Sequence, residues 1–398
     1  MIEILFAIII GCILGIFTGL TPGVHINLVA VIIFSISSTI TNLFSVNLIV
    51  IALISMGIVH TFLDIIPTTF LGLPDEDNIM AALPAHKLTL EGKAKVAITI
   101  SAIGAFSGLL IILSLSPLVM IYLKNIYEVI NPLIAYILIW VSIMSLYSSN
   151  NKLNSLFIFL LSGLFGYLIL NSKVIIQPLL PMLSGLFGVS ALLFSINLKT
   201  KIPKQVKDTE IKFKDLGFFR NSSSGIISCL LTSFLPGLTA SHTTMIASYL
   251  SKIKSSIDYL FINSCIGTVS MFLSLIAIYS IGKARNGVII VISNLVNIDQ
   301  QLFLILICSI LISSSIAIIL LFKLTDISIK LMEKINYLIL CGGLIIFIVI
   351  LVFLISGWIG LVVLTTSTAI GILPYGLNVE KMHTMGVILI PVIIFFLF

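Results

Sequence analysis

Long apolar runs constrain this chain more than any other feature. Stretches of about 18–25 mostly apolar residues recur from one end to the other, and three of them are Met1–Leu20, Leu302–Phe322 and Tyr337–Ser356. That length crosses a hydrocarbon core roughly 30 Å thick, and in lipid only helices or closed barrels satisfy the backbone hydrogen bonds. Because the runs are continuous and do not alternate with period two, they predict an all-α integral membrane bundle with about ten to twelve membrane segments.

The composition excludes a water-soluble alternative. The 398 residues are 59% hydrophobic and only 9% charged, whereas a soluble domain carries roughly 25% charged residues. The first apolar run has no basic residues before it, carries Glu3, and is not followed by a small-x-small cleavage site, so it predicts a retained membrane segment. We therefore expect a multi-pass protein of the cell membrane.

A basic stretch near the middle of the chain separates two halves. Its cations are Lys199, Lys201, Lys204, Lys207, Lys212, Lys214 and Arg220. By the positive-inside rule the stretch is cytoplasmic. It reads best as a solvated linker, and the alternative is a surface that contacts anionic lipid. The predicted division is a first transmembrane repeat over residues 1–198, a linker over 199–224, and a second transmembrane repeat over 225–398.

Matching elements in the two halves predict an internal duplication. The first half opens with Thr18-Gly-Leu-Thr-Pro22-Gly23 and the second with Thr232-Ser-Phe-Leu-Pro236-Gly237. In register after them, the segment from Gly57 to Asp64 resembles the segment from Gly267 to Ser274, and each half has a further glycine fifteen residues after the first. Duplicated halves with broken helices at corresponding positions are typical of secondary transporters. The sequence does not decide between parallel and inverted repeats.

Basic residues on both sides of the second Pro-Gly pair favour a re-entrant hairpin there. Arg220 precedes the apolar segment 226–250, and Lys252 and Lys254 follow it. Charges that belong on the same side of the membrane predict that the chain enters and leaves by that side. We therefore expect two half-helices that meet at Pro236 and Gly237.

The Pro-Gly breaks are the best candidates for a binding site. Proline ends a helix, and glycine allows dihedral angles that other residues avoid. The half-helix that restarts presents free N–H groups and the positive end of its dipole, which suits a carboxylate or a phosphate. The alternative is a pair of structural proline kinks. The predicted substrate-binding residues are Thr18, Thr21, Pro22, Gly23, His25, Asn27, Thr232, Pro236, Gly237, Thr239, Ser241, His242 and Thr243.

Charged residues near the breaks are candidates for ion coupling. Asp64 follows an apolar helix, and an ionisable group at mid-membrane costs roughly 2.5–3.5 kcal/mol, so it usually faces a cavity or a partner. A coupling proton or Na⁺ could use this carboxylate. Asp75 lies in an acidic segment, and Lys283 and Arg285 stand at the corresponding place in the second half. These groups could form an ion pair between the halves, attract an anionic substrate, or mark a cytoplasmic end.

The residue pattern does not indicate an enzyme or a metalloprotein. The five cysteines stand alone in apolar runs, no CxxC pair occurs, and no nucleophile elbow, phosphate loop, HExxH or Rossmann fingerprint is present. His60 and His383 read as solitary polar groups. We predict no catalytic residues, no metal, no cofactor and no nucleic-acid partner.

Several of these motifs together resemble a known family. They are the Gly15–Gly23 element, the loop at Pro74, the segment Leu83–Ala94, the segment Gly185–Ser190 and the second Pro236-Gly237 pair. In this order they resemble the large membrane subunit of tripartite tricarboxylate transporters, especially a shorter branch found in archaea. The chain departs from the family by its length and by Leu-Pro-Gly-Leu-Thr-Ala-Ser in the second half, where a glycine-richer pattern is expected.

The resemblance implies a secondary carrier of carboxylates that is driven by an ion gradient, with an external binding protein and a small membrane subunit as partners. It places substrate contacts near Thr21–Asn27 and Pro236–Thr243. The function we expect is transport of a small organic anion coupled to H⁺ or Na⁺, and a homo-oligomer is compatible with it. An alternative is a translocase for polyprenyl phosphate that uses the same helix breaks, and a third is a scaffold or membrane enzyme without transport.

Overall fold

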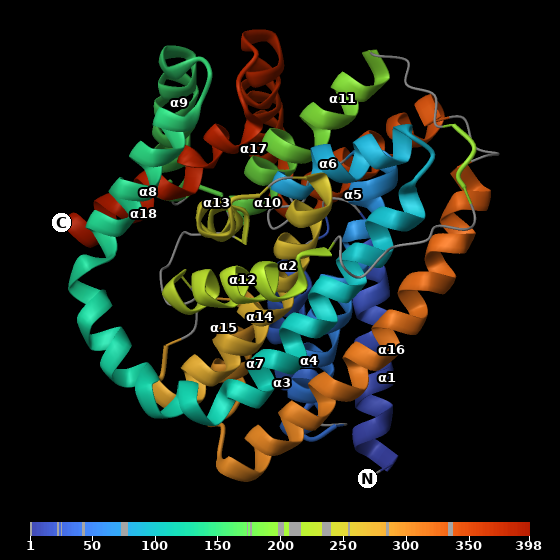
Figure 1. Ribbon diagram of the computed structural model, residues 1–398, viewed down its shortest axis with the longest axis vertical. Helices are drawn as coiled ribbons and strands as arrows, with labels where there is room; N and C mark the ends of the chain where they lie inside the picture. Colours follow the sequence, from blue (N-terminus) through green and yellow to red (C-terminus); the bar gives the residue numbers. More distant parts are fainter. Residues whose placement is uncertain are drawn as a thin grey trace.

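The computed structural model describes residues 2–398 except 22, 23, 25, 42, 43, 73–78, 173, 176, 198–202, 207–215, 233–239, 254, 284, 285 and 333–336. The described residues form helices and turns, with no strand among them (Figure 1). Seven helical stretches in this part of the chain are long and apolar enough to cross a membrane. The predicted all-α membrane fold is therefore confirmed. The count of ten to twelve segments, which includes hairpin arms, stays a prediction.

The chain opens with a helical hairpin that packs on a long helix. The elements are α1 (Ile2–Leu20), α2 (Ile26–Ser35), α3 (Ser37–Ile40) and α4 (Val46–Leu63). The start of α1, the end of α2 and the start of α4 line one pocket through Glu3, Ile33 and Leu48, so both outer ends of the hairpin lie at the same end of α4. The ten residues of α2 extend about 15 Å, which is half of a hydrocarbon core.

A second hairpin also precedes a long helix. Its arms are α12 (Phe218–Thr232) and α13 (Ala240–Ser251), the long helix is α14 (Ser256–Ile281), and α15 (Gly287–Leu295) follows. Arg220, near the start of α12, donates to Asp258, near the start of α14, at 2.5 Å. Because α14 also begins five residues after α13 ends, both outer ends of this hairpin lie at the same end of α14.

Glycines let α1 approach α4 closely. Gly11, Gly15 and Gly19 recur every four residues along the face of α1 that meets α4. A Cβ atom added to Gly11 would lie 2.7 Å from Cβ of Ser55, and one added to Gly15 would lie 2.8 Å from the carbonyl oxygen of Met56. Spacing of small residues by four is a common way for membrane helices to pack backbone against backbone.

The second hairpin meets α14 through corresponding positions. Gly225 and Cys229 lie 214 residues after Gly11 and Gly15, which is also the separation of the two Pro-Gly pairs. Gly225 faces Cys265, and the Cys229 thiol donates to the carbonyl of Ile266 at 3.5 Å. Cys265 and Ile266 lie 210 residues after their α4 counterparts, which is the separation of Gly57 and Gly267. The contacts of one hairpin therefore recur, position for position, in the other.

The two later glycines of the sequence pattern share one backbone conformation. Gly72 ends α5 (Ile65–Leu71) with φ 63° and ψ 21°, and Gly282 ends α14 with φ 66° and ψ 21°. In each case the glycine N–H donates to the carbonyl four residues earlier, Thr68 or Ile278. This left-handed helix cap favours glycine because a Cβ atom is strained there.

The two halves pack against each other reciprocally. The further elements are α6 (Ile79–Leu90), α7 (Ala94–Ile130) and α16 (Gln300–Met332). α4 packs against α15 and α16, and α14 packs against α6 and α7; likewise α2 packs on α15 and α13 packs on α6. Figure 1 shows α4 rising from α3 toward α5, whereas α14 descends from α13 toward α15. Equivalent helices therefore run in opposite directions.

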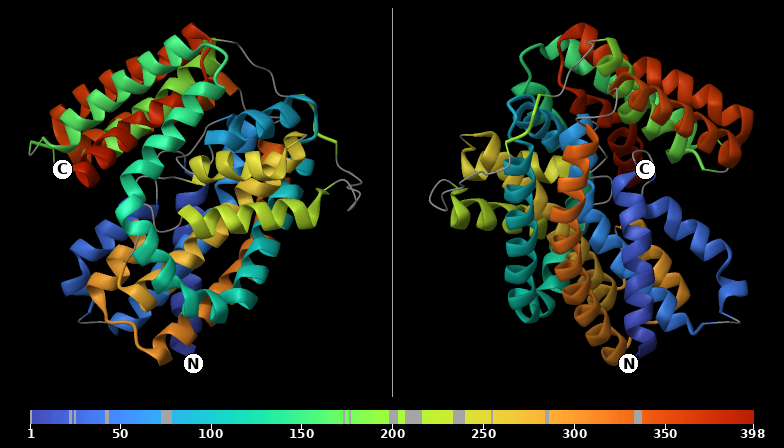
Figure 2. Two further views of the ribbon diagram at one scale, coloured as in Figure 1. Left: turned by 60° about the vertical axis from the view of Figure 1, so that its left-hand side comes forward. Right: turned by 90° about the vertical axis from the view of Figure 1, so that its right-hand side faces the viewer.

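The remaining helices form a separate flanking bundle, which both views of Figure 2 place beside the hairpin bundle of α1–α7 and α12–α16. Its elements are η1 (Asn131–Leu133), α8 (Ile134–Ser148), α9 (Lys152–Leu170), α10 (Leu179–Leu183), the π-helix η2 (Ser184–Val189), α11 (Ser190–Asn197), α17 (Tyr337–Leu377), η4 (Lys381–Met385) and α18 (Gly386–Leu397). Lys381 donates to the Phe187 carbonyl at 3.0 Å and to the Ser190 hydroxyl at 2.8 Å. Its ammonium thus satisfies a carbonyl of the π-helix.

Part of the basic linker docks on the turn between α6 and α7. The Val206 N–H donates to the Gly92 carbonyl at 2.8 Å. The side chain of Gln205, which is 8% exposed, accepts from the Ala94 N–H and donates to the Thr89 carbonyl, both at 3.0 Å. Residues 203–206 are therefore anchored by hydrogen bonds and are not a freely solvated linker. The division of the chain into two repeats and a linker stays a prediction.

Candidate functional site

At the first break, the hydroxyl of Thr18 forms its hydrogen bond within α1. Thr18 is buried and its hydroxyl donates to the Gly15 carbonyl at 3.3 Å. Thr21 is half-buried; its N–H donates to the Phe17 carbonyl at 3.1 Å, and its own carbonyl accepts from the Val24 N–H at 3.2 Å. The helical hydrogen bonding of α1 thus continues to Thr21, one residue past its end at Leu20. Pro22, Gly23 and His25 lie outside the described residues.

At the second break, two threonines join the arms of the hairpin. The hydroxyls of Thr232, at the end of α12, and Thr243, in the first turn of α13, lie 2.8 Å apart. Both side chains are buried. Pro236, Gly237 and Thr239 lie outside the described residues, as do the side chains of Ser241 and His242. The structure therefore brings together two of the predicted site residues of this half.

Asn27 connects the first hairpin to the second half of the chain. Its side chain, in the first turn of α2, packs against Gly287, the first residue of α15; a Cβ atom on Gly287 would lie 2.6 Å from Oδ1 of Asn27. Asn286 caps the start of α15, and its side chain accepts from the Val288 N–H at 2.9 Å. The N-termini of two short helices therefore converge beside the first break, and their dipoles both favour a negative charge there.

The family of the chain follows from its similarity to known proteins. A family model described as the tripartite tricarboxylate transporter TctA family matches residues 5–386. The chain belongs to this family. An uncharacterised protein of Methanocaldococcus jannaschii is 32% identical over 413 aligned positions that cover all of both chains. No solved structure matches.

Membership of the TctA family makes the chain a transporter of the tricarboxylate type in the membrane and not an enzyme. The resemblance predicted from the Pro-Gly elements is thereby confirmed, as is the location in the cell membrane as a multi-pass protein. The family is that of a tripartite system. Neither the family match nor the described residues support the polyprenyl-phosphate alternative.

In this TctA-family chain, Asp64 lies next to the first break. It occupies the kink between α4 and α5 and is 7% exposed. Gly19, near the end of α1, lies against its backbone; a Cβ atom there would be 3.4 Å from the Asp64 nitrogen. The Thr68 hydroxyl donates to the Asp64 carbonyl at 2.8 Å. A buried carboxylate thus stands beside the end of the broken helix.

Of the charged residues predicted in the acidic loop and in the corresponding basic loop, the structure describes only some. Lys283 is exposed and follows Gly282, so it lies at the end of α14 opposite Arg220. Asp75 and Arg285 lie outside the described residues. The three alternatives for these groups therefore stay predictions.

Sequence reasoning missed Asn263 as a residue of the second hairpin. Its side chain is buried in α14 and accepts from the Thr244 hydroxyl, in α13, at 3.0 Å. The signal was present, because an amide in the middle of a 26-residue apolar helix rarely lacks a specific partner.

His60 and His383 lie in different bundles, which fits the prediction that they do not form a relay. Among the described residues, no His, Cys, Asp and Glu side chains are grouped as a metal site.

Proposed function

We propose that this chain is a secondary carrier of a small carboxylate, coupled to H⁺ or Na⁺, that holds its substrate at paired half-helix N-termini. The observation that carries the proposal is the packing of Asn27 against Gly287, which joins the N-termini of α2 and α15 beside the first break. Free N–H groups and aligned dipoles at such ends bind carboxylates. α13, which follows the second break, likewise packs on α6 of the first half.

The reciprocal packing of the halves supports an inverted repeat. Each half supplies one hairpin and two long helices to a shared bundle, and α4 and α14 run in opposite directions. Inverted repeats place a substrate site near the midplane, and exchange of the two halves' conformations exposes it alternately to either side. In this proposal the described residues that contact or frame the substrate are Thr18, Thr21, Asn27, Thr232 and Thr243.

Asp64 is the proposed coupling residue. Asp64 is buried beside the end of α1, and the buried His60 lies one turn before it. Ser274, the corresponding residue of α14, donates its hydroxyl to the Ser270 carbonyl of its own helix at 2.8 Å and carries no charge. Binding of H⁺ or Na⁺ at Asp64 would neutralise this carboxylate before the bundle moves.

The distribution of cations supports a cytoplasmic position for the end of the bundle that holds the linker. Lys204 belongs to the docked linker segment, and Lys93 and Lys95 lie at the turn that receives it. By the positive-inside rule this end faces the cytoplasm and the N-terminus faces outward. We propose an external binding protein and a small membrane subunit as partners, as in a tripartite system.

Counterflow in proteoliposomes tests the function. Vesicles preloaded with one unlabelled carboxylate should accumulate the same labelled compound, and a panel of mono-, di- and tricarboxylates, with and without Na⁺ and pH gradients, identifies substrate and ion. Asn27→Leu should raise the KM for the transported compound, whereas Asn171→Leu, which changes an exposed amide of the flanking bundle, should not. Absence of counterflow for every compound, with or without a gradient, contradicts the proposal.

A further inference from the structure

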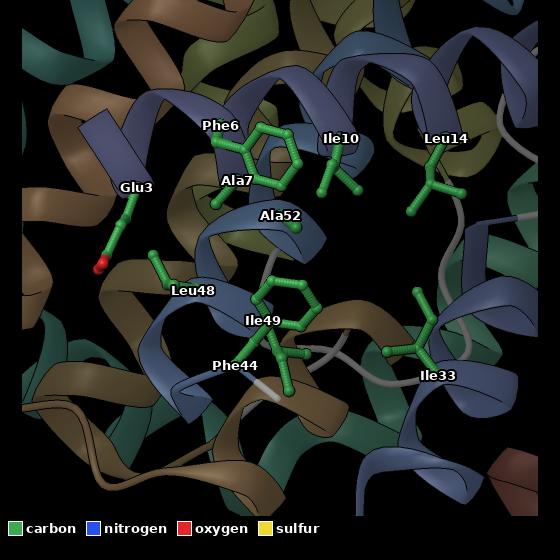
Figure 3. A pocket seen from close by; sticks show the side chains of 10 residues that line it. All are labelled: Glu3, Phe6, Ala7, Ile10, Leu14, Ile33, Phe44, Leu48, Ile49 and Ala52. Carbon is green, nitrogen blue, oxygen red and sulfur yellow. The ribbon is translucent and has the colours of Figure 1, made fainter. Parts of the chain in front are cut away.

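An apolar cavity of about 210 Å³ lies between α1, the end of α2 and the first turns of α4. Figure 3 shows Ile10 and Leu14 on α1 facing Ile33 on α2 and Ile49 and Ala52 on α4 across an open space. Among the residues that line it, Glu3 is the one that carries a charge. The cavity lies away from the helix break, toward the end of the hairpin where α1 begins.

The corresponding place in the second hairpin is filled by polar side chains. The positions that match Phe6, Ala7 and Leu48 of the cavity hold Arg220, Asn221 and Asp258. Asp258 accepts from Arg220 at 2.5 Å and from Asn221 at 2.7 Å. We call these three residues the polar clamp. The first hairpin thus lacks the clamp and has a cavity where the clamp would be.

The lining of the cavity selects its occupant. Apolar cavities of this size stay free of water because they offer too few hydrogen bonds. An anionic substrate is disfavoured as well, because the one charged group at the cavity is the carboxylate of Glu3 and burial of an unpaired charge is costly. Hydrocarbon is the chemistry that remains.

The bilayer can supply that hydrocarbon directly. Phe6 and Phe44 line the cavity and are 53% and 43% exposed, and they continue into an exposed apolar face of α1 that includes Ile9 and Ile13. Glu3 lies in the first turn of α1. Leu14 lies eleven residues later, which corresponds to a rise of about 16 Å along the helix. That is about half of a hydrocarbon core, so the cavity runs from the level of the headgroups toward the midplane.

We infer that the cavity holds one acyl chain of a membrane lipid, with the chain alongside α1 and the headgroup near Glu3. The carboxylate favours a zwitterionic headgroup that carries an ammonium over an anionic one. The acyl chain lies beside the positions that correspond to the polar clamp of the other half, between α1, the end of α2 and the first turns of α4. This site does not depend on the proposed substrate.

Photocrosslinking of the purified chain tests the inference without any transport assay. The chain is placed in nanodiscs of phosphatidylethanolamine that contain a trace of the same lipid with a diazirine near the end of one acyl chain. After irradiation, mass spectrometry should find label on Ile10, Leu14, Ile33 and Ala52 in addition to the outer residues Ile9 and Ile13. Label on Ile9 and Ile13 alone would contradict the proposed lipid site.

Matched phenylalanine substitutions locate the label. Ala52→Phe fills the cavity and should reduce cavity label by at least about fivefold while outer label is retained, because the ring takes the space of the chain. Ile13→Phe adds a ring on the lipid-facing side of α1 and should leave cavity label unchanged. If Ala52→Phe lowers the melting temperature or aggregates, Ile10→Phe fills the cavity from the opposite wall. Unchanged cavity label in a well-folded filled variant contradicts the inference.

The role of Glu3 has its own test. In mixed nanodiscs, diazirine-labelled phosphatidylethanolamine should label the cavity more than equally labelled phosphatidylglycerol. Glu3→Gln should remove that difference by neutralising the carboxylate. A preference that survives the substitution, or a preference for the anionic lipid in the unaltered chain, contradicts the placement of the headgroup.

Discussion

The two hairpins contact their long helices through corresponding positions, yet their outer ends are closed differently. Gly15 of the first and Cys229 of the second both meet the backbone of the neighbouring helix at matching residues. Beyond these contacts, the second hairpin is held to α14 by the polar clamp, and the first faces an apolar cavity. Backbone packing therefore defines the shared architecture, and the side chains at the outer ends decide how firmly each hairpin is held.

This difference predicts which hairpin is displaced more easily from its long helix. Separation of α12 from α14 requires that Asp258 lose its charged and amide partners in a buried position, which is costly. Separation of α1 from α4 exposes mainly apolar surface, and in a bilayer lipid replaces those contacts at little cost. We therefore expect the first hairpin to be the more mobile one.

The largest expected effect comes from the charge that distinguishes α4 from α14. Asp64→Ser gives the first half the residue that the second half has at Ser274. Gradient-driven uptake by proteoliposomes should be abolished, because the substitution removes the buried carboxylate that would bind the coupling ion. Ser274→Ala is the control and should leave uptake close to that of the unaltered chain. Full uptake by Asp64→Ser would remove Asp64 from the coupling mechanism.

Removal of the polar clamp should have the next largest effect. Asp258→Leu, which installs the residue found at Leu48, should lower the free energy of unfolding by about 3 kcal/mol, the low end for a buried pair, because the Arg220 guanidinium is partly exposed. Thermal unfolding in detergent measures it. The triple change Arg220→Phe, Asn221→Ala and Asp258→Leu should be less destabilising than the single change. A single variant as stable as the parent chain would show that the clamp does not hold the hairpin.

An exchange between Gly15 and Cys229 tests how closely each hairpin packs. Gly15→Cys should destabilise the fold by roughly 1–3 kcal/mol, because its Cβ atom meets Val59 Cβ at 2.6 Å. Cys229→Gly removes a small side chain and should cost about 1 kcal/mol. Both are measured by thermal unfolding. Equal losses would mean that the two interfaces are equally close.

The paired glycine caps allow a smaller comparison. Gly282→Ala adds the strain of a positive φ and should cost about 1–2 kcal/mol, since no non-neighbouring atom of the described residues lies within 4 Å of the added carbon. Gly72→Ala should cost more, because its Cβ atom would also lie 3.0 Å from the His86 ring. The difference between the two melting temperatures reports the contact with His86, and its absence would show that the ring moves aside.

The smallest expected effect is a pH dependence that arises at His86. Burial lowers the pKa of His86 below its usual value of 6.5, although its bond with the Thr69 carbonyl opposes the shift. The unfolded chain therefore takes up a proton near pH 6.5 that the folded chain resists, so stability is lost as the pH falls from 7.5 through the folded pKa. The melting temperature should fall over this range, and His86→Gln should reduce the fall. An equal fall in the variant would assign it to other groups.

The sequence predicted where the helix is interrupted in each half, because the signals for a break are local. Pro-Gly pairs, flanking hydroxyls and the fifteen-residue spacing to Gly72 and Gly282 each follow from short-range backbone chemistry. The membrane class and the family also followed from long apolar runs and motif order, and both were confirmed.

The contacts between the halves were not predictable in the same way. That α14 packs on α7, and that Asn27 meets Gly287, depends on how distant segments meet in space. The anchoring of Gln205 was missed because a single glutamine in a basic stretch has the composition of a solvated linker. Lys381 was missed because its partners arise from a π-helix in η2, which no short motif in the sequence signals.

The anchored linker sets a limit on any relative motion of the two bundles. α11 of the flanking bundle ends at Asn197, and the docked segment begins at Pro203 on the hairpin bundle. Only the residues between them connect these two points, so even when fully stretched this tether reaches about 20 Å. If the hairpin bundle moves past the flanking bundle during transport, the five residues between these points limit how far it can travel. Lengthening this tether would test directly whether that limit is ever reached.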